Sequence, residues 1–281
     1  MSWIVIGAIA VIIIIVLILF ISMIKGMLRE GFTGILVLLL VSSAWYCYTN
    51  NITTPNQAFT KVKTYVQSWF TTNNNDMFTE RLTGNESSKT DYGATFIMGE
   101  LDELGRSTYA HILVRDNEEP GQNGIKRDEH INVDPTGWKN YKVGENWVFN
   151  RTHLVGWQFS GVNDDIRNLI IGTSYLNKGT DNKGTKQDNP DGMLYYEQQL
   201  DSWLANHPNY QLDYYVKPIY EGNELAPRKV YMQWVGVDAD NNTIPIKIGG
   251  KSHDIKDDYQ GVVLENTSPS LKIDYTTLNK K

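Results

Sequence analysis

The stretch from Trp147 to Gly161 limits what this chain can fold into, because it carries polar groups in the middle of an apolar segment. A strand can bury the apolar side chains on either side of Asn150, Arg151 and His153 in a core. An arginine and a histidine in the same place need partners for their polar groups. The chain has five histidines, so one beside an arginine in an apolar run marks a candidate functional site. The alternative is a histidine that is simply hydrogen-bonded at the end of a strand.

The composition allows a sizeable folded domain and argues against a generally basic binding protein. The 281 residues include eight Trp and sixteen Tyr, which are enough aromatic side chains for a substantial core. The formal net charge is −6, so any binding of a polyanion must come from a local patch or from a metal ion. Cys47 is the single cysteine, so an intrachain disulfide is excluded. This fits a reduced compartment or an export route that does not depend on disulfides.

The N-terminal part reads as a membrane anchor over residues 1–48. The run from Trp3 to Ile24 is uncharged and long enough to cross a bilayer, and a shorter apolar run from Phe32 to Tyr48 ends in aromatic residues. Both runs can span as a hairpin with Lys25 and Arg29 in a cytoplasmic turn, or the first spans and the second lies at the interface. The positive-inside rule favours the hairpin. We predict a cell-membrane protein, bound to the lipid bilayer here, whose remaining domain faces the extracellular side.

Two further regions follow the anchor. Residues 49–92 are rich in Thr, Asn and Ser and predict a polar stalk, and residues 93–281 predict the folded domain. Apolar residues at helical spacing indicate a short amphipathic helix within the stalk. These residues are Phe59, Val62, Val66, Trp69 and Phe70.

The order of expected elements in the domain predicts the α+β class. A helix over Pro190–Asn206 separates a first group of strands from a second. The expected strands are Ser107–Arg115, Leu212–Tyr220 and Lys229–Asp238, with weaker ones at Ile244–Ile248 and Gly261–Leu264. Strands before and after one helix favour a central, mainly antiparallel sheet.

The expected helix contains a carboxylate on its apolar face. Met193, Leu200 and Leu204 form a buried stripe, and Glu197 lies on the same stripe. A carboxylate that faces a core needs an arginine, a metal ion or ordered water as its partner. The alternative is a residue at the edge of the buried face with its carboxylate in solvent.

Several common chemistries find no support in the sequence. A glycine-rich phosphate loop after a strand, a Cys or His zinc pattern and a His-Glu-x-x-His helix are all missing. A serine nucleophile elbow is missing as well. The single cysteine lies in the predicted anchor, where it cannot attack a soluble substrate.

The polar residues that are left suit the hydrolysis of a phosphodiester, which needs a base for water and a cation for the phosphate. His153 is a candidate base. A neutral asparagine oxygen, from Asn168 or Asn177, together with water molecules suits Mg²⁺. Glu197 can hold a metal-bound water, and Arg151 can clamp the phosphate.

The segment Asn150-Arg151-Thr152-His153 resembles the Asp-Arg-Gly-His motif of the DNA/RNA non-specific endonuclease family, the ββα-metal or His-Me finger nucleases. Among these it is similar to streptodornase-type DNases and membrane-anchored DNA-entry nucleases. The resemblance spans roughly residues 93–238. Four further segments carry it, in order: Asp134–Trp138, Arg167–Leu169, Tyr175–Asn177 and Asp191–Glu197.

The resemblance implies a ββα-metal nuclease fold and a role for each matched residue. His153 would be the general base and Asn177 the direct metal ligand. Asn168 and Glu197 would be supporting active-site residues, Glu197 through metal-bound water, and Arg151 would be structural or phosphate-facing. Mg²⁺ is the expected cofactor, with Mn²⁺ as a substitute. The expected substrate contacts are Arg151 and Arg167.

Three positions depart from the family pattern. Asn150 stands where the family has an acidic residue, so the residue that orients the motif has lost its charge. Thr152 replaces a glycine, which can reshape the turn but leaves His153 in register. Asp201 stands where some relatives carry an arginine, which puts leaving-group stabilisation by that arginine in doubt.

Together these features predict a Mg²⁺-dependent endonuclease with little sequence preference that hydrolyses DNA, with RNA as a further candidate substrate. One alternative is an anchored module of the same fold that binds nucleic acid without cutting it. Another is a structural surface protein whose polar site is a remnant. The oligomeric state is not predicted.

Overall fold

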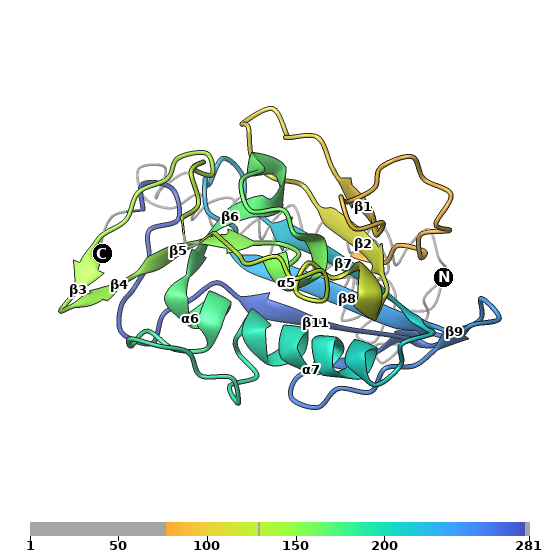
Figure 1. The fold of residues 1–281 in the computed structure, drawn as a ribbon. Coiled ribbons are helices and arrows are strands. Elements are labelled where there is room, and N and C mark those ends of the chain that lie inside the picture. The colour runs from red at the N-terminus through yellow and green to blue at the C-terminus, as the bar shows by residue number, and fades with distance from the viewer. Residues whose placement is uncertain (1–76, 129, 279–281) are drawn as a thin grey trace, which may run out of the picture. The chain divides into compact units, whose positions relative to one another are not determined.

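A seven-stranded sheet forms the centre of the fold in the computed structural model, which describes residues 77–128 and 130–278 (Figure 1). The strands lie in the order β1, β2, β7, β8, β11 and β10, and β9 pairs with β8. Every pair is antiparallel, which confirms the predicted α+β class with a mainly antiparallel sheet. The bounds are β1 Thr95–Met98, β2 Ala110–Val114, β7 Gln211–Ile219, β8 Lys229–Val237, β9 Thr243–Ile244, β10 His253–Lys256 and β11 Tyr259–Glu265.

The predicted membrane anchor over residues 1–48 lies outside the described residues, and so does the predicted amphipathic helix of the stalk. Within the two described ranges, no helix combines the length and the apolar character that crossing a bilayer requires. The anchor therefore stays a prediction from the sequence.

Side chains alternate along β7 and show how one face of the sheet is covered. Leu212, Tyr214 and Val216 point to the same face, where they join the main hydrophobic core. Helix α7 (Met193–Ala205) lies along this face, close to the predicted helix over Pro190–Asn206 (Figure 1). Its buried stripe contributes four side chains to the core: Met193, Tyr196, Leu200 and Leu204.

The opposite face of the sheet is covered by residues that the sequence assigned to the stalk. Met77 packs against Tyr215 and Tyr231, and the Leu82 N–H donates to the buried Asp213 carboxylate at 2.9 Å. The predicted stalk over 49–92 therefore reaches too far, because its last part, residues 77–92, packs on the sheet. The polar composition of this segment is typical of a stalk. Some of its backbone groups, however, form hydrogen bonds with polar groups of the sheet, and a sequence pattern does not predict such contacts.

A second, smaller sheet is built on the core side. Strand β5 (Phe149–His153) pairs antiparallel with β6 (Leu169–Thr173), and helix α6 (Ser174–Lys178) follows directly. Leu154, Ile170 and Leu176 place this ββα unit in the same core as α7. The remaining short elements are β3 Lys142–Val143, β4 Asn146–Trp147, α5 Trp157–Ser160 and the 3₁₀ turns η1 Asp116–Glu118 and η2 Ile166–Asn168.

We expect Asp213→Ala to lower the free energy of unfolding by about 1–3 kcal/mol, because it leaves two buried donors without an acceptor. Asp213 is fully buried and accepts from Leu82 N and from His111 Nε2, each at 2.9 Å. Urea unfolding of the purified chain measures the change. The exposed Asp188→Ala is the matched control and should stay within about 0.5 kcal/mol of the wild type. Equal losses in both variants would contradict the proposed role of Asp213.

Candidate active site

The ββα unit carries both the candidate base and the candidate metal ligand. His153 is the last residue of β5 and faces Leu169 of β6 in the ladder. Strand β6 runs straight into α6, whose first turn is capped by the Thr173 hydroxyl accepting from Leu176 N at 2.9 Å. Asn177 lies near the end of this short helix, which stops at Gly179 in the left-handed region.

The His153 ring is buried and held at both nitrogens. Nε2 lies 3.1 Å from the Asn163 carbonyl oxygen, and Nδ1 lies 3.4 Å from Arg127 Nη2. A carbonyl only accepts, so we assign the proton to Nε2 and the lone pair to Nδ1. Burial, together with the positive charge of Arg127, lowers the pKa of His153 to about 4. The ring is therefore neutral at pH 7 and able to accept a proton.

Arg127 is a candidate site residue that the sequence reasoning missed. It lies in the polar segment Asp116–Asp128, which reads as an ordinary surface loop. Besides reaching His153, it donates from Nε to the Asn163 side chain at 3.3 Å, and its charge acts on the buried Glu197. A single arginine in a loop has no periodic pattern, so only the folded chain shows where it points.

Glu197 faces the interior. This agrees with the interpretation that its carboxylate is buried and disagrees with the alternative that the carboxylate lies in solvent. Its Oε1 accepts from the Gly156 N–H at 3.2 Å and from the Tyr214 hydroxyl at 3.5 Å. Burial raises the pKa of Glu197 to about 7, against the opposing effects of hydrogen bonds from Gln158, Gly156 and Tyr214 and the charge of Arg127. Gly156 comes three residues after His153, so this contact links α7 to the end of β5.

Asn168 lies beneath the site and holds its backbone. The Asn168 side chain is fully buried; its Nδ2 donates to the Val155 carbonyl and its Oδ1 accepts from the Val155 N–H, both at 3.0 Å. The Asn168 carbonyl accepts from Leu154 N at 2.8 Å. The oxygen and the nitrogen of the Asn168 carboxamide are thus both hydrogen-bonded to the backbone of Val155, two residues after His153.

An open cleft lies beside this unit. The residues that line it include Arg127, His130, Trp138, Asn150, Arg151 and Asn177, and Trp147 forms part of its wall. None of the described residues that line the cleft is an aspartate or a glutamate. Arg127 and Arg151 therefore place positive charge in the described lining of this cleft, in a chain of net charge −6. His153 itself is not part of the lining, but Arg127, which donates to it, is.

The motif residues ahead of His153 are held by polar contacts. Arg151 Nε donates to Asp134 at 2.6 Å, and its guanidinium lies 4.7 Å from the centre of the Trp138 ring. The Asn150 side-chain oxygen accepts from the Ser174 hydroxyl at 3.3 Å, which ties β5 to the start of α6. The departure at Asn150 thus keeps a neutral acceptor where the family has a charge.

The other motif departure in β5 leaves the strand regular. Thr152 is buried, and the ladder between β5 and β6 continues through it without a bulge. A side chain at Gly172 of the neighbouring strand would lie 2.3 Å from the Thr152 hydroxyl. The glycine therefore makes room for Thr152, and His153 keeps its register.

Neither Arg167, the second predicted substrate contact, nor Asp201, the third departure from the family pattern, is among the described residues that line the cleft. Arg167 pairs with Asp165 through two hydrogen bonds of 3.0 and 2.6 Å and does not line the cleft. Asp201 shares a hydrogen bond with Glu119, the residue after η1, and burial raises the pKa of both carboxyl groups. Asp201 is therefore paired with a second acid.

The donors at the cleft fit a hydrated, oxygen-preferring cation. Asn177 lines the cleft, and its carboxamide makes no hydrogen bond to another side chain or backbone group within the described residues. The same residues contain no group of three or more His, Cys, Asp or Glu that could hold a metal. One amide oxygen completed by water suits Mg²⁺, which keeps much of its hydration shell.

Replacing Glu197 by glutamine should change how stability depends on pH. Because the pKa of Glu197 is raised from 4.5 to about 7, the folded chain holds a proton that the unfolded chain loses between these values. The resulting stabilisation is complete below pH 4.5 and disappears as the pH rises through 7. We expect the wild type to lose roughly 1–3 kcal/mol relative to Glu197→Gln between about pH 5 and about pH 8 in urea unfolding. The exposed Glu103→Gln should follow the wild type, and identical profiles for all three chains would refute this expectation.

Comparisons with known proteins agree with this geometry. The profile of the DNA/RNA non-specific endonuclease family matches residues 86–235. A solved "extracellular nuclease" is 39% identical with a TM-score of 0.54 and covers 66% of this chain and 91% of its own. An "extracellular endonuclease" is 36% identical with a TM-score of 0.59 and covers 74% of this chain and 92% of its own. The search of curated proteins found no match.

A more distant structure shares the fold alone. The Sda1 nuclease with bound zinc ion is 20% identical, has a TM-score of 0.50, and covers 66% of this chain and 79% of its own. The family match includes more than half of the chain and contains both His153 and Asn177. This chain therefore belongs to the DNA/RNA non-specific endonuclease family, a family of nuclease enzymes.

Proposed function

We propose that the chain is a divalent-metal-dependent endonuclease that hydrolyses DNA phosphodiester bonds without sequence preference, with RNA as a second candidate substrate. One observation carries this proposal. A neutral, buried His153 directs its Nδ1 lone pair toward Arg127, at the edge of a cleft whose described lining residues include two arginines and no carboxylate. This arrangement supports both the activation of water and the binding of a polyanion.

His153 acts as the general base. Its Nε2–H is fixed by the Asn163 carbonyl, so Nδ1 is the atom that takes a proton from the attacking water. The 3.4 Å contact from Arg127 is long for a hydrogen bond and is easily given up. When a phosphate enters, Arg127 moves to it and uncovers the lone pair.

Arg127 and Arg151 bind the phosphate and stabilise the charge that develops on it. Arg127 and Arg151 both line the cleft and supply positive charge to it. Arg151 is positioned in advance by Asp134 and by the Trp138 ring. Fixed cations aimed at a developing anion are among the largest contributions to catalysis.

Asn177 would hold Mg²⁺, or Mn²⁺ in its place, through the carboxamide oxygen, and Glu197 would hold it through water. When bound, the ion acts as a Lewis acid on the phosphate and supports the leaving oxygen. Asn168 is a positioning residue in this proposal, because its bonds to Val155 fix the chain between His153 and Gly156. Asn150 orients α6 against β5 through Ser174.

We also propose that the enzyme is held on the outer face of the cell membrane. The apolar runs within residues 1–48 support the anchor. The names of the two similar structures, an extracellular nuclease and an extracellular endonuclease, support the side on which the domain lies.

Degradation of plasmid DNA by the full chain with Mg²⁺ tests the proposal. We expect His153→Ala to lower the rate by about 10²–10⁴-fold, because the variant has no base for the attacking water. EDTA should stop the reaction. His253→Ala replaces an exposed histidine on β10 and should leave the rate unchanged. If the wild type leaves the plasmid intact, or if the wild type and His153→Ala degrade it at equal rates, the proposal is wrong.

Arg127 is predicted to act on both the phosphate and the base. We expect Arg127→Ala to lower kcat/KM by about 10²–10³-fold, with partial recovery in Arg127→Lys. Arg127 also lowers the pKa of His153, so its loss should move the acid limb of the pH–rate profile to higher pH. Arg167→Ala removes an arginine that is paired with Asp165 outside the cleft lining, and a small effect is expected. A rate loss without any shift of the acid limb would contradict the second role.

A further inference from the structure

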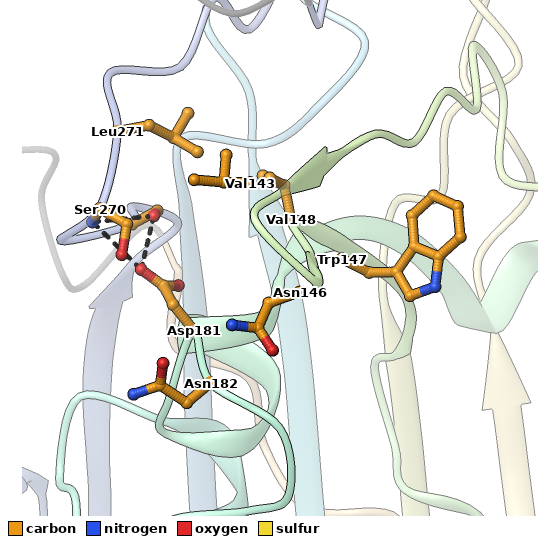
Figure 2. Close-up of a pocket in the computed structure, with 9 residues that line it drawn as sticks. Val143, Asn146, Trp147, Val148, Asp181, Asn182, Ser270 and Leu271 are labelled. Atoms are coloured by element: carbon orange, nitrogen blue, oxygen red, sulfur yellow. Dashed lines mark hydrogen bonds between the residues drawn. The ribbon is translucent and has the colours of Figure 1, made fainter.

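The β3–β4 hairpin presents a large aromatic ring to solvent. Trp147 is 52% exposed, more than the other large apolar side chains that are exposed in the described part of the chain, Leu104 at 39% and Ile125 at 45%. Figure 2 shows its indole pointing away from the small pocket beside Asp181 and Ser270. Trp147 also contributes to the wall of the open cleft beside Asn177. Trp147 therefore lines the same cleft as Asn177, the proposed metal ligand.

Two aromatic rings of this cleft lie close to cations. The Lys142 ammonium is 4.9 Å from the centre of the Trp147 ring, across the β3–β4 ladder. The Arg151 guanidinium is 4.7 Å from the Trp138 ring. Trp138 is half-buried, whereas Lys142 and Trp147 are both exposed. The Trp147 pair is thus the one that can receive a ligand.

Aromatic rings beside cations, in a cleft whose described lining residues include no acid, match the chemistry of unpaired nucleic acid. Bases stack on aromatic faces whatever their identity, and lysine pairs with the phosphates between them. In a duplex the base faces are already stacked on each other, so an exposed indole can compete for a base only where the strand is unpaired.

The distance along the chain fits one continuous strand. Five residues lie between Trp147 and His153, so their Cα atoms are at most about 20 Å apart even if the chain between them is fully extended. A strand whose scissile phosphate lies at His153 therefore reaches the hairpin within a few nucleotides. Arg151 and Asn150 also line this cleft, and none of its described lining residues is a carboxylate; the nearby Asp134 is paired with Arg151.

We propose that Trp147 is a stacking platform for an unpaired base of the bound strand, with Lys142 on the adjacent phosphate. This inference rests on the proposed function and adds a preference to it: single-stranded or locally opened nucleic acid binds better than intact duplex. The platform does not depend on base identity, which agrees with cleavage that is non-specific in sequence.

Fluorescence anisotropy with full-length chain tests the platform. His153→Ala serves as the background so that the probe is not cut. The probes are labelled oligothymidine and an oligomer of equal length that carries abasic sugar phosphates. We expect oligothymidine to bind about 5- to 150-fold more tightly, the range for stacking of one base. Adding Trp147→Ala should bring this ratio near one and leave binding of the abasic oligomer unchanged.

Two further variants separate stacking from general damage. Trp147→Phe keeps an aromatic face and should keep most of the ratio, whereas Trp147→Leu keeps apolar volume and should lose it. Leu104→Ala, at an exposed apolar side chain that does not line the cleft, is the matched control. An unchanged ratio in Trp147→Ala and Trp147→Leu would overturn the platform.

The same chains distinguish this inference from the proposed function. If the chain with His153 intact leaves DNA uncut but the ratio still depends on Trp147, the nuclease proposal fails and the platform stands. If that chain cuts DNA while Trp147→Ala changes neither the ratio nor the preference for single strands over duplex, the platform fails and the nuclease proposal stands.

Discussion

The site depends on the pair of hydrogen bonds between the Asn168 side chain and the backbone of Val155. These bonds join the chain leaving β5 to the chain entering β6, at the place where His153 ends its strand. The same segment presents the Gly156 N–H to Glu197 on α7. One buried carboxamide thus sets the relative positions of a candidate base and a buried acid. The Asn168 side-chain oxygen and nitrogen are both hydrogen-bonded, so burying this carboxamide leaves no unpaired polar group and carries no penalty for one.

Charge is distributed so that an acidic chain keeps a positive cleft. Asp165 pairs with Arg167, Asp201 hydrogen-bonds Glu119, and neither acid lines the cleft. Asp134 contacts a residue of the cleft lining, and it holds Arg151 in place. Polyanion binding by a chain of net charge −6 is therefore a matter of local arrangement, since fields at close range outweigh a screened net charge.

The sequence predicted the parts of the fold that depend on local pattern. The long strands β7 and β8 and the helix α7 follow from periodicity, because each buries one face or stripe in a single core. Periodicity put Glu197 on the apolar stripe of α7 but left open whether its carboxylate faces the interior or solvent. It did not place Met77 and Leu82 on the sheet or bring Arg127 to His153. Those contacts join residues that are far apart in the chain and that lie in segments with the composition of a surface loop. The local pattern of apolar and polar residues therefore does not predict them.

By itself the sequence determined the order of strands and helix, the family motif around His153, and the neutral residue at Asn150. Only the tertiary structure decided which nitrogen of His153 bears the lone pair, that Asn168 acts on backbone, and that Trp147 borders the cleft. The reason is physical: periodicity records which face of an element is buried, whereas hydrogen-bond partners and cleft walls are set by segments that meet after folding. The roles proposed for His153 and Asn177 depend on that meeting.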